Sequence, residues 1–255
     1  MAGVSRLQYT SETRLVRVMC AGRVDLAFVL RAFVNGMDGV FIGGCRLGEC
    51  NYMTHGNYQA LNMVLLCRKI MAYIGLDSRR LYIEFMSSGE GLRFVEAMHA
   101  FGRQVTALGP LGSGEEADAA ALKQQLEQVQ RLVPYIKMAK REKLETRLAD
   151  EAAYDDFFDM QEVERLFSDA PSFYIDPAEC RACMICRRRC PVDAIDGAKN
   201  RIHVIDQNRC IKCGTCLDVC PPRFKAVRRI KNAPVPPPPA EEERTIRRKP
   251  DKKKQ

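Results

Sequence analysis

The chain has 255 residues, of which 46% are hydrophobic and 28% are charged. This composition is ordinary for folded proteins, so it excludes wholesale disorder and a fibre, and the length suits one large domain or two modest ones. No apolar run approaches the eighteen residues of a membrane span, and the first residues lack the apolar segment of a secretory signal. We therefore expect a cytoplasmic protein with no direct membrane span.

The net charge of +8 is concentrated at the end of the chain. Residues 223–255 contain twelve Lys and Arg against four Asp and Glu, which accounts for the whole net charge and leaves residues 1–222 neutral overall. Prolines, three glutamates and a basic end make up most of this tail. Such a composition buries too little apolar surface to offset the entropy of ordering, so we expect residues 232–255 to be a disordered basic tail.

Strand and helix patterns alternate along residues 13–110. Residues 13–20 alternate apolar and polar side chains, which predicts a strand. Asp25 is placed to cap a helix whose apolar face has helical spacing and consists of Leu26, Val29, Leu30 and Phe33. Residues 39–43 then form a short apolar stretch typical of a buried strand.

The same alternation continues to the end of this region. Residues 57–74 have helical period and stop at Gly75, residues 81–86 predict a strand, and Ser88 opens another helix. Three β-α units in succession favour a parallel sheet with right-handed crossovers. We expect residues 1–111 to form a small α/β domain with a flavodoxin-like parallel sheet.

Residues 112–171 have a different composition. Most of this segment is rich in Ala, Leu, Glu, Gln, Lys and Arg, which are good helix formers. Pro134 interrupts it and predicts a kink or a split. We interpret the segment as an exposed helical linker; a partner-binding helix is the alternative, which the sequence does not separate from the first.

Twelve cysteines are the most informative feature of the composition. In a reducing compartment they indicate metal or redox chemistry rather than disulfides. Residues 175–191 and 205–221 repeat the same pattern after a shift of thirty residues: Ile-Asp, four cysteines and a final proline. Each set has the spacing C-x2-C-x2-C-x3-C-P, so we expect residues 172–231 to form an α+β two-cluster ferredoxin domain.

This spacing predicts two [4Fe–4S] clusters with crossed ligands, because the fourth cysteine of each run binds the other cluster. The first cluster would use Cys180, Cys183, Cys186 and Cys220, and the second would use Cys210, Cys213, Cys216 and Cys190. A pair of zinc knuckles is the alternative, but zinc patterns pair two C-x2-C units across a longer gap and leave the third cysteine and the proline without a purpose. With every iron held by protein, the module is typical of an electron relay and not of a catalyst.

Three further cysteines lie near the predicted sheet. Cys20 ends one predicted strand, Cys45 follows the next, and Cys50 lies in a glycine-rich loop. The first two should emerge at the carboxyl edge of the sheet, where open α/β sheets hold their ligands. Cys67 falls within a predicted helix and is expected to be a small core residue.

The residues around these cysteines carry a family resemblance. Three blocks in order closely resemble the delta subunit of methyl-viologen-reducing hydrogenase: VMCAGRVD, FIGGCRLGECNYMTHGNYQALNMVLL and YIEFMSSGEGLRFVEAM. The likeness covers about the first 110 residues, and fusion to a ferredoxin domain also occurs in that family. It implies an electron-transfer subunit that accepts electrons from a hydrogenase, a formate dehydrogenase or an NAD(P)H-oxidising partner. The acceptor would be a heterodisulfide-reductase-like flavoprotein that bifurcates electron pairs.

The resemblance also implies a [2Fe–2S] cluster at Cys20, Cys45 and Cys50. Such a cluster ordinarily needs four ligands. His55 is one candidate for the fourth, although a lone loop histidine is more often a hydrogen-bonding residue. Family members carry an earlier segment with a strand and a cysteine cluster, so we expect the natural product to start upstream of Met1. A natural short form, with this site empty or completed by another subunit, is the alternative, and the upstream DNA decides between them.

Two other classes of function are weaker. A stand-alone flavoenzyme would use the glycine-rich loop, but this loop lacks a phosphate fingerprint such as G-x-G-x-x-G. A nucleic-acid-binding iron–sulfur protein would use the basic tail, but the only aromatic residue there is Phe224, so a stacking platform is missing. We therefore expect no nucleic-acid partner and no catalytic residues in this chain.

Overall fold

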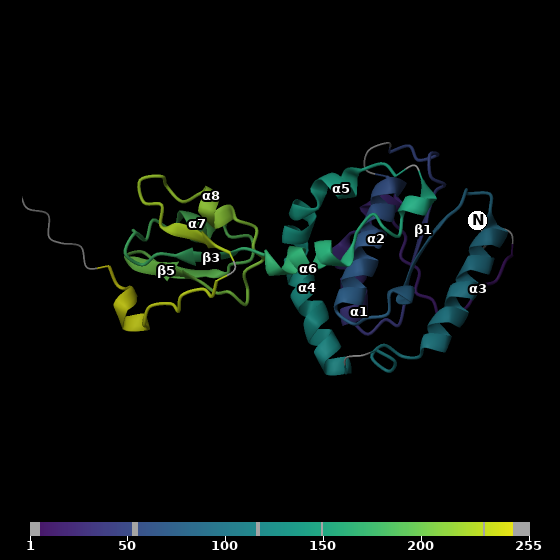
Figure 1. The fold of residues 1–255 in the computed structure, drawn as a ribbon, viewed down its shortest axis with the longest axis horizontal. Coiled ribbons are helices and arrows are strands. Elements are labelled where there is room, and N and C mark those ends of the chain that lie inside the picture. The colour runs from purple at the N-terminus through teal and green to yellow at the C-terminus, as the bar shows by residue number, and fades with distance from the viewer. Residues whose placement is uncertain (1–5, 53–55, 116–117, 149, 232, 247–255) are drawn as a thin grey trace, which may run out of the picture. The chain divides into compact units, whose positions relative to one another are not determined.

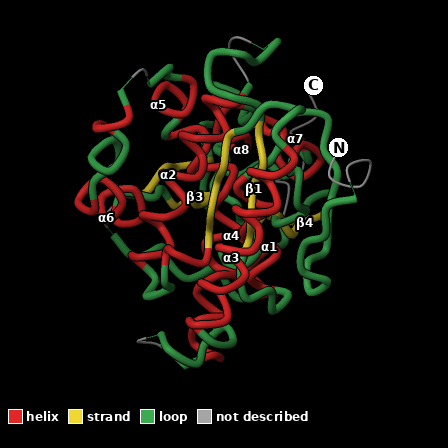
Figure 2. The backbone as a smooth tube through the Cα atoms, turned by 90° about the vertical axis from the view of Figure 1, so that its right-hand side faces the viewer, coloured by secondary structure: helices red, strands yellow, loops and turns green. Residues whose placement is uncertain are grey.

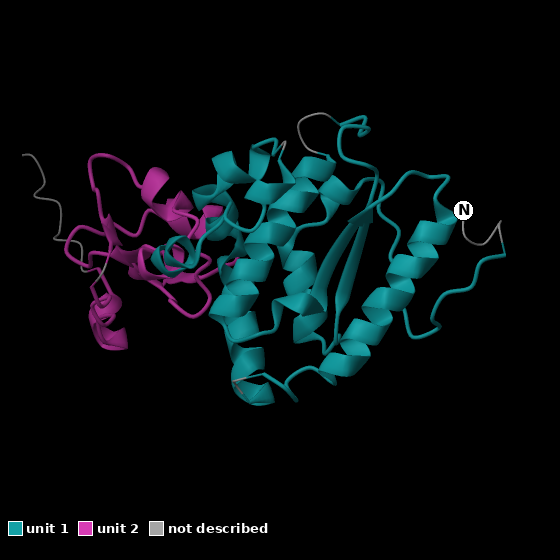
Figure 3. Cartoon of the chain, turned by 45° about the vertical axis from the view of Figure 1, so that its right-hand side comes forward, with its two compact units in different colours: residues 1–165 teal, residues 166–255 magenta. Residues whose placement is uncertain are grey.

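The computed structural model describes residues 6–52, 56–115, 118–148, 150–231 and 233–246 (Figure 1). The chain divides into two compact units, residues 1–165 and residues 166–255 (Figure 3). Helices make up most of the regular structure of the first unit (Figure 2): α1 (Leu26–Val34), α2 (Asn57–Tyr73), α3 (Gly91–Leu108), α4 (Ala119–Ala139), α5 (Arg141–Glu145) and α6 (Met160–Ser168), the last of which runs past residue 165. No helix in the described ranges is both long and apolar enough to cross a membrane.

The sheet of the first unit has two parallel strands, β1 (Val40–Gly44) and β2 (Leu81–Phe85). Val40 pairs with Leu81 and the register continues to the end of both strands. One face of the sheet packs on α3 through aromatic rings, since the ring of Phe101 lies 5.8 Å from Phe41 and 5.9 Å from Tyr82. The predicted parallel sheet is confirmed at this coarse level.

The helix at residues 26–34 confirms the prediction made from its spacing. The Asp25 carboxylate accepts a hydrogen bond from Ala27 N at 2.9 Å and so satisfies one of the unpaired N–H groups at the helix start. The buried residues of α1 are the predicted ones, Leu26, Val29, Leu30 and Phe33. Gly75, with φ +75°, follows the end of α2 as expected.

The strand predicted at residues 13–20 is wrong. All of these residues are described, and they lie in no helix and no sheet. Leu15, Val16 and Met19 remain 68%, 82% and 90% exposed. An alternating pattern becomes a strand only when a neighbouring strand accepts its backbone hydrogen bonds, and neither β1 nor β2 pairs with this segment.

Residues 119–145 also differ from the expected linker. Helix α4 packs along α1, and α5 packs on α2, so both belong to the first unit. The buried residues of α4 form a stripe at helical spacing: Leu122, Leu126, Val129, Val133, Tyr135 and Ile136. Pro134 does not split the helix, because α4 continues through it to Ala139.

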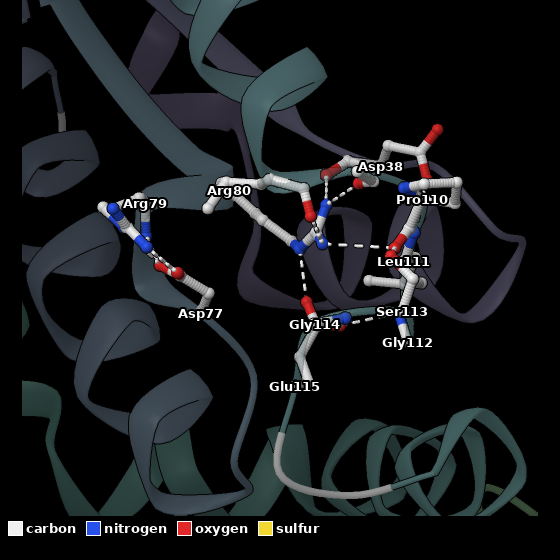
Figure 4. Close-up of polar contacts among 12 residues, drawn as sticks. Asp38, Asp77, Arg79, Arg80, Pro110, Leu111, Gly112, Ser113, Gly114 and Glu115 are labelled. Atoms are coloured by element: carbon white, nitrogen blue, oxygen red, sulfur yellow. Dashed lines mark hydrogen bonds and ion pairs between the residues drawn. The ribbon is translucent and has the colours of Figure 1, made fainter.

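The buried guanidinium of Arg80 forms hydrogen bonds with the end of α3 and with the segments before β1 and α4 (Figure 4). Arg80 Nε donates to Glu115 Oε1 at 2.5 Å, and both side chains are 1% exposed. The guanidinium also donates to the carbonyl oxygens of Asp38, Gly109, Leu108 and Pro110, at 2.9 to 3.3 Å. The carbonyl of Leu108, the last residue of α3, is thereby satisfied together with those of the two residues that follow it, which holds the end of α3 and the start of the chain toward α4 in place.

Besides the end of α6, the described residues of the second unit contain two antiparallel strand pairs, two short α-helices and a 3-10 turn (Glu241–Arg244). Strand β3 (Ser172–Ile175) pairs with β6 (Val227–Ile230), and β4 (Ile195–Ala198) pairs with β5 (Arg201–Ile205). Helices α7 (Ile185–Arg189) and α8 (Thr215–Asp218) each follow a cysteine-rich loop. The core of this unit mixes hydrocarbon and cysteine side chains: Phe173, Ile175, Cys180, Cys186, Ile195, Ile205, Ala226 and Val227.

Residues 233–246 differ from the expected disordered tail, because they pack on the second unit. The prolines at 236–239 line a cavity with Tyr174 and Val204. Beyond them, Ile246 N donates to Asn200 O at 2.8 Å, and Glu241 accepts from Arg201 at 2.6 Å. Proline loses little entropy on ordering, which explains why this composition can still pack. Residues 247–255 of the expected tail lie outside the described residues.

Candidate metal centres

Each half of the second unit presents its first cysteine through the same hydrogen-bonded turn. In the first half Asp176 O accepts from Cys180 N at 3.0 Å, and the Asp176 carboxylate accepts from Ala178 N at 3.0 Å. In the second half Asp206 O accepts from Cys210 N, also at 3.0 Å. The sequence repeat is therefore a repeat of backbone geometry as well.

Both loops then coil through left-handed backbone conformations at equivalent positions. The φ angles are +50° at Ala182 and +57° at Lys212, followed by +66° at Met184 and +80° at Gly214. Three of these four residues carry a side chain and so adopt this conformation at a cost. Such strain persists at functional sites, and here it turns the backbone around the cysteines.

The first group of thiols draws on both halves of the repeat. Burial raises the pKa of Cys186 to about 12, and the neighbouring thiols of Cys180, Cys183 and Cys220 add to the effect. Cys180 and Cys186 are themselves buried. Cys220 belongs to the second cysteine run, so the structure brings one thiol of that run to three thiols of the first.

The second group is the reciprocal one. A small pocket is lined by the sulfur-bearing residues Cys190, Cys210, Cys213 and Cys216, together with apolar neighbours. Burial raises the pKa of Cys216 to about 12, and the thiols of Cys210, Cys213 and Cys186 also raise it. Because Cys186 belongs to the first group, the two groups adjoin at these two residues.

The donor chemistry of both groups fits a four-iron cluster. Iron–sulfur clusters are held by thiolates, and each group offers four. A buried thiol resists ionisation, as the raised pKa of Cys186 shows, so bound iron is what would stabilise its thiolate. In the parts of the chain that the structure describes, no three His, Cys, Asp or Glu side chains are close enough to hold a single metal ion. The thiol groups are thus more widely spread than a mononuclear site.

Three thiols of the first unit are also brought together. Burial raises the pKa of Cys45 to about 11, and the thiols of Cys50 and Cys20 add to the effect. Burial opposes ionisation of Cys50 as well, but backbone N–H groups and hydrogen bonds to Cys45 and Cys20 hold the pKa of its thiol below the ordinary value. Cys45 directly follows β1, so the predicted position at the carboxyl edge of the sheet is confirmed for this residue.

Two residues that the sequence did not single out shape this cluster of three. Asn57, 1% exposed, donates from Nδ2 to Cys45 O at 3.0 Å and to Arg46 O at 2.6 Å. A Cβ atom on Gly56 would overlap the Cys50 thiol, so only glycine fits there. The feature of the sequence that could have pointed to these two residues is the Gly-Asn pair that follows the cysteine loop and begins α2.

One further cysteine and two histidines remain to be placed. Cys67 is fully buried in α2, and burial raises the pKa of its thiol to about 12, which confirms a core role. His55 lies outside the described residues. His203, unmarked in the sequence, is 1% exposed and lies 3.9 Å from the sulfurs of Cys180 and Cys186.

A small parallel sheet with three clustered thiols, next in the chain to a duplicated eight-thiol unit, defines the class as iron–sulfur electron-transfer proteins. Comparison with known families agrees. Residues 1–109 match the family "Methyl-viologen-reducing hydrogenase, delta subunit", and residues 179–224 match the "4Fe-4S dicluster domain". The chain belongs to the delta-subunit family and carries a 4Fe-4S dicluster ferredoxin domain in addition.

Individual relatives match the first unit. The iron–sulfur subunit of the F420-non-reducing hydrogenase of Archaeoglobus profundus is 43% identical over 110 residues, which are 43% of this chain and 80% of that protein. The vhc iron–sulfur subunit of the same type of hydrogenase in Methanococcus voltae is 41% identical over 109 residues, 43% of this chain and 75% of the relative.

A relative of another kind contains the same region. It is a component of the ferredoxin/F420H2-dependent CoB-CoM heterodisulfide reductase of Methanosarcina acetivorans, and it is 38% identical over 120 residues. These residues are 47% of this chain but 15% of that protein. The delta-type unit thus occurs both in separate hydrogenase subunits and within a much longer reductase chain, and these relatives support an electron-transfer role for this chain.

Proposed function

We propose that this chain is a non-catalytic electron-transfer subunit whose second unit holds two [4Fe–4S] clusters with crossed ligands. Cys180, Cys183, Cys186 and Cys220 would hold one, and Cys210, Cys213, Cys216 and Cys190 the other. When bound, the clusters would supply reversible one-electron transfer. The observation that carries the proposal is the pair of interleaved thiol groups: Cys220 lies with the first group, Cys190 lines the pocket of the second, and the two groups adjoin at Cys186 and Cys216.

The proposed partners follow from the relatives. Two of them are iron–sulfur subunits of hydrogenases, and a heterodisulfide reductase chain contains a related region. We propose that electrons come from a hydrogenase, a formate dehydrogenase or an NAD(P)H-oxidising partner. They would leave to a heterodisulfide-reductase-like flavoprotein that bifurcates electron pairs. The reducing cytoplasm, where thiols stay available for iron, is the compartment we propose.

For the first unit we propose a flavodoxin-like arrangement and a [2Fe–2S] cluster at Cys20, Cys45 and Cys50. The grouping of these thiols and the N–H groups directed at Cys50 support the cluster, since hydrogen bonds to sulfur are common around iron–sulfur centres. An ordinary [2Fe–2S] centre has four ligands, so a fourth donor must join these three.

Cluster content tests the proposal. Anaerobically reconstituted protein should contain about eight irons and eight labile sulfides from the second unit, plus about two of each if the first site is filled. Cys190→Ala should disturb the cluster held by Cys210, Cys213 and Cys216, and leave the EPR signal of the other. Cys67→Ala is the matched control and should keep every cluster. Loss of the Cys180 cluster in place of the Cys210 cluster would refute the crossing.

A further inference from the structure

A buried histidine lies against the first group of thiols. His203 is 1% exposed, and its Nδ1 atom lies 3.9 Å from the Sγ atoms of both Cys180 and Cys186. On the far side of the ring, Nε2 lies 3.2 Å from Met184 Sδ. A thiolate is a far better hydrogen-bond acceptor than a thioether, so with thiolates present the ring proton belongs on Nδ1, facing both cysteines.

The fold makes room for this ring. His203 lies on β5, and the pairing of β4 with β5 shifts register between Asp196 and Ala198, opposite it. Gly197 occupies this bulge with φ +154°, and a Cβ atom on it would overlap the imidazole. The bulge and the glycine therefore leave room for the ring and fix its position, and the positive φ of Gly197 is a second reason why only glycine suits this place.

The internal repeat provides a built-in comparison. Subtracting thirty residues from His203 gives Phe173, whose ring lines the cavity formed by the second thiol group. A Cβ atom on Gly214 would lie 3.5 Å from the Phe173 ring, and Gly214 is the repeat counterpart of Met184. The same place in the two halves thus carries an N–H donor in one and a hydrocarbon ring in the other.

The second group has polar neighbours of its own. Lys212 acts electrostatically on Cys210, and the Thr215 hydroxyl lies 3.3 Å from Cys213 Sγ. The counterparts of these two residues in the first half are Ala182 and Ile185. Each half therefore has a different means of stabilising negative charge on its sulfurs.

We propose that His203 tunes the first [4Fe–4S] cluster by sharing its Nδ1–H between the thiolates of Cys180 and Cys186, which raises that cluster's midpoint potential. This rests on the proposed function, because it needs the cluster to be bound. A hydrogen bond to a ligand sulfur withdraws electron density, and so favours the reduced state, which carries one more negative charge. Arg187 and Asp196 are the charged groups that act on the ring.

The test is an EPR-monitored potentiometric titration of the reconstituted full chain. His203→Phe copies the residue found in the other half, and should move one midpoint to lower potential while the other stays fixed. His203→Gln keeps an N–H donor and should recover part of the shift. Phe173→His, the reciprocal change, should raise the midpoint potential of the second cluster. Lys212→Ala should lower that same potential, which identifies the midpoint that belongs to the second cluster.

A spectroscopic signature separates hydrogen bonding from packing. Protein labelled with 15N-histidine and reduced should show nitrogen coupling to the first cluster in pulsed EPR, and His203→Phe should abolish it. Absence of this coupling in the native chain, or equal potentials in all His203 variants at full iron content, would overturn the inference. A native chain that binds no iron at the second unit would instead refute the proposed function itself.

Discussion

A buried ion pair and an exposed one lie next to each other in the first unit. Arg80 and Glu115 form a buried ion pair, and the Arg80 guanidinium also donates hydrogen bonds to four backbone carbonyl oxygens. Its neighbour Arg79 makes a similar pair with Asp77, but on the surface, with the arginine side chain 66% exposed (Figure 4). The two adjacent arginines therefore provide a matched comparison of a buried and an exposed pair.

Glu115→Gln should lower the free energy of unfolding of the first unit by about 3–5 kcal/mol, because it leaves a buried cation without its counter-charge. Asp77→Asn, the same type of change in the exposed pair, should leave the unfolding midpoint almost unchanged, since water screens that pair. Urea unfolding followed by far-UV circular dichroism measures both. Equal midpoints for the two variants would show that the buried pair has no special role.

Asn57→Asp should lower the iron occupancy of the Cys20, Cys45 and Cys50 site. The change removes the amide donor that holds the carbonyls of Cys45 and Arg46, and places a carboxylate against them. Iron per chain and the [2Fe–2S] EPR signal measure the effect. Asn51→Asp makes the same substitution at an exposed position of the same loop and should change neither. Full occupancy in Asn57→Asp would mean that the cysteine loop holds its shape unaided.

The eight cysteines of the second unit could be found from sequence because their spacing is local and repeated. Asn57, His203 and Arg80 could not, because their importance lies in what distant segments place around them. Asn57 meets a carbonyl twelve residues away, and His203 meets a thiol twenty-three residues away. A single Asn, His or Arg has no sequence pattern that predicts which distant residues it will contact.

At the scale of elements, local capping and spacing predicted α1 and the α2 stop well, whereas pairing and docking were predicted poorly. The segment at residues 13–20 has the alternation of a strand but no neighbouring strand. Helix α4 has the composition of an exposed helix, yet one stripe of it is buried on the first unit. Both errors arise because alternation and composition describe a segment by itself, whereas strand pairing and helix docking depend on which segments lie beside it.

Ile136→Ala should destabilise the first unit by about 2–5 kcal/mol, because Ile136 is fully buried on the inner stripe of α4 and the change leaves a cavity. Gln125→Ala, on the exposed side of the same helix, should leave stability within a few tenths of a kcal/mol. Thermal unfolding of the two variants beside the native chain makes the comparison. An effect of Ile136→Ala no larger than that of Gln125→Ala would return α4 to the role of a linker.

At the scale of the whole molecule, the chain has the parts of a carrier. In the proposed arrangement protein ligands occupy every iron of the two [4Fe–4S] clusters, so no iron has an open position for a substrate.

The isolated full chain should therefore show no turnover of hydrogen, formate or NADH, yet be bleached by a strong chemical reductant and recolour when an oxidised acceptor is added. Absorbance near the iron–sulfur bands under anaerobic conditions follows both steps. A chain in which Cys186 and Cys216 are both changed to Ser serves as the control, and should lose most of the bleaching. Measurable hydrogen or NADH oxidation by the purified chain would contradict the carrier role.

The interleaving of the two thiol groups also constrains the order of events during synthesis. Cys180, Cys183 and Cys186 leave the ribosome well before Cys220, yet their group is complete only when Cys220 arrives. The reciprocal group waits for Cys216, although Cys190 is made early. Iron delivered to the nascent chain would find three thiols at most in the first group. With the proposed crossed ligands, maturation of both clusters would wait until the duplicated segment has been fully translated, and a chain cut short between the two repeats would be unable to complete either one.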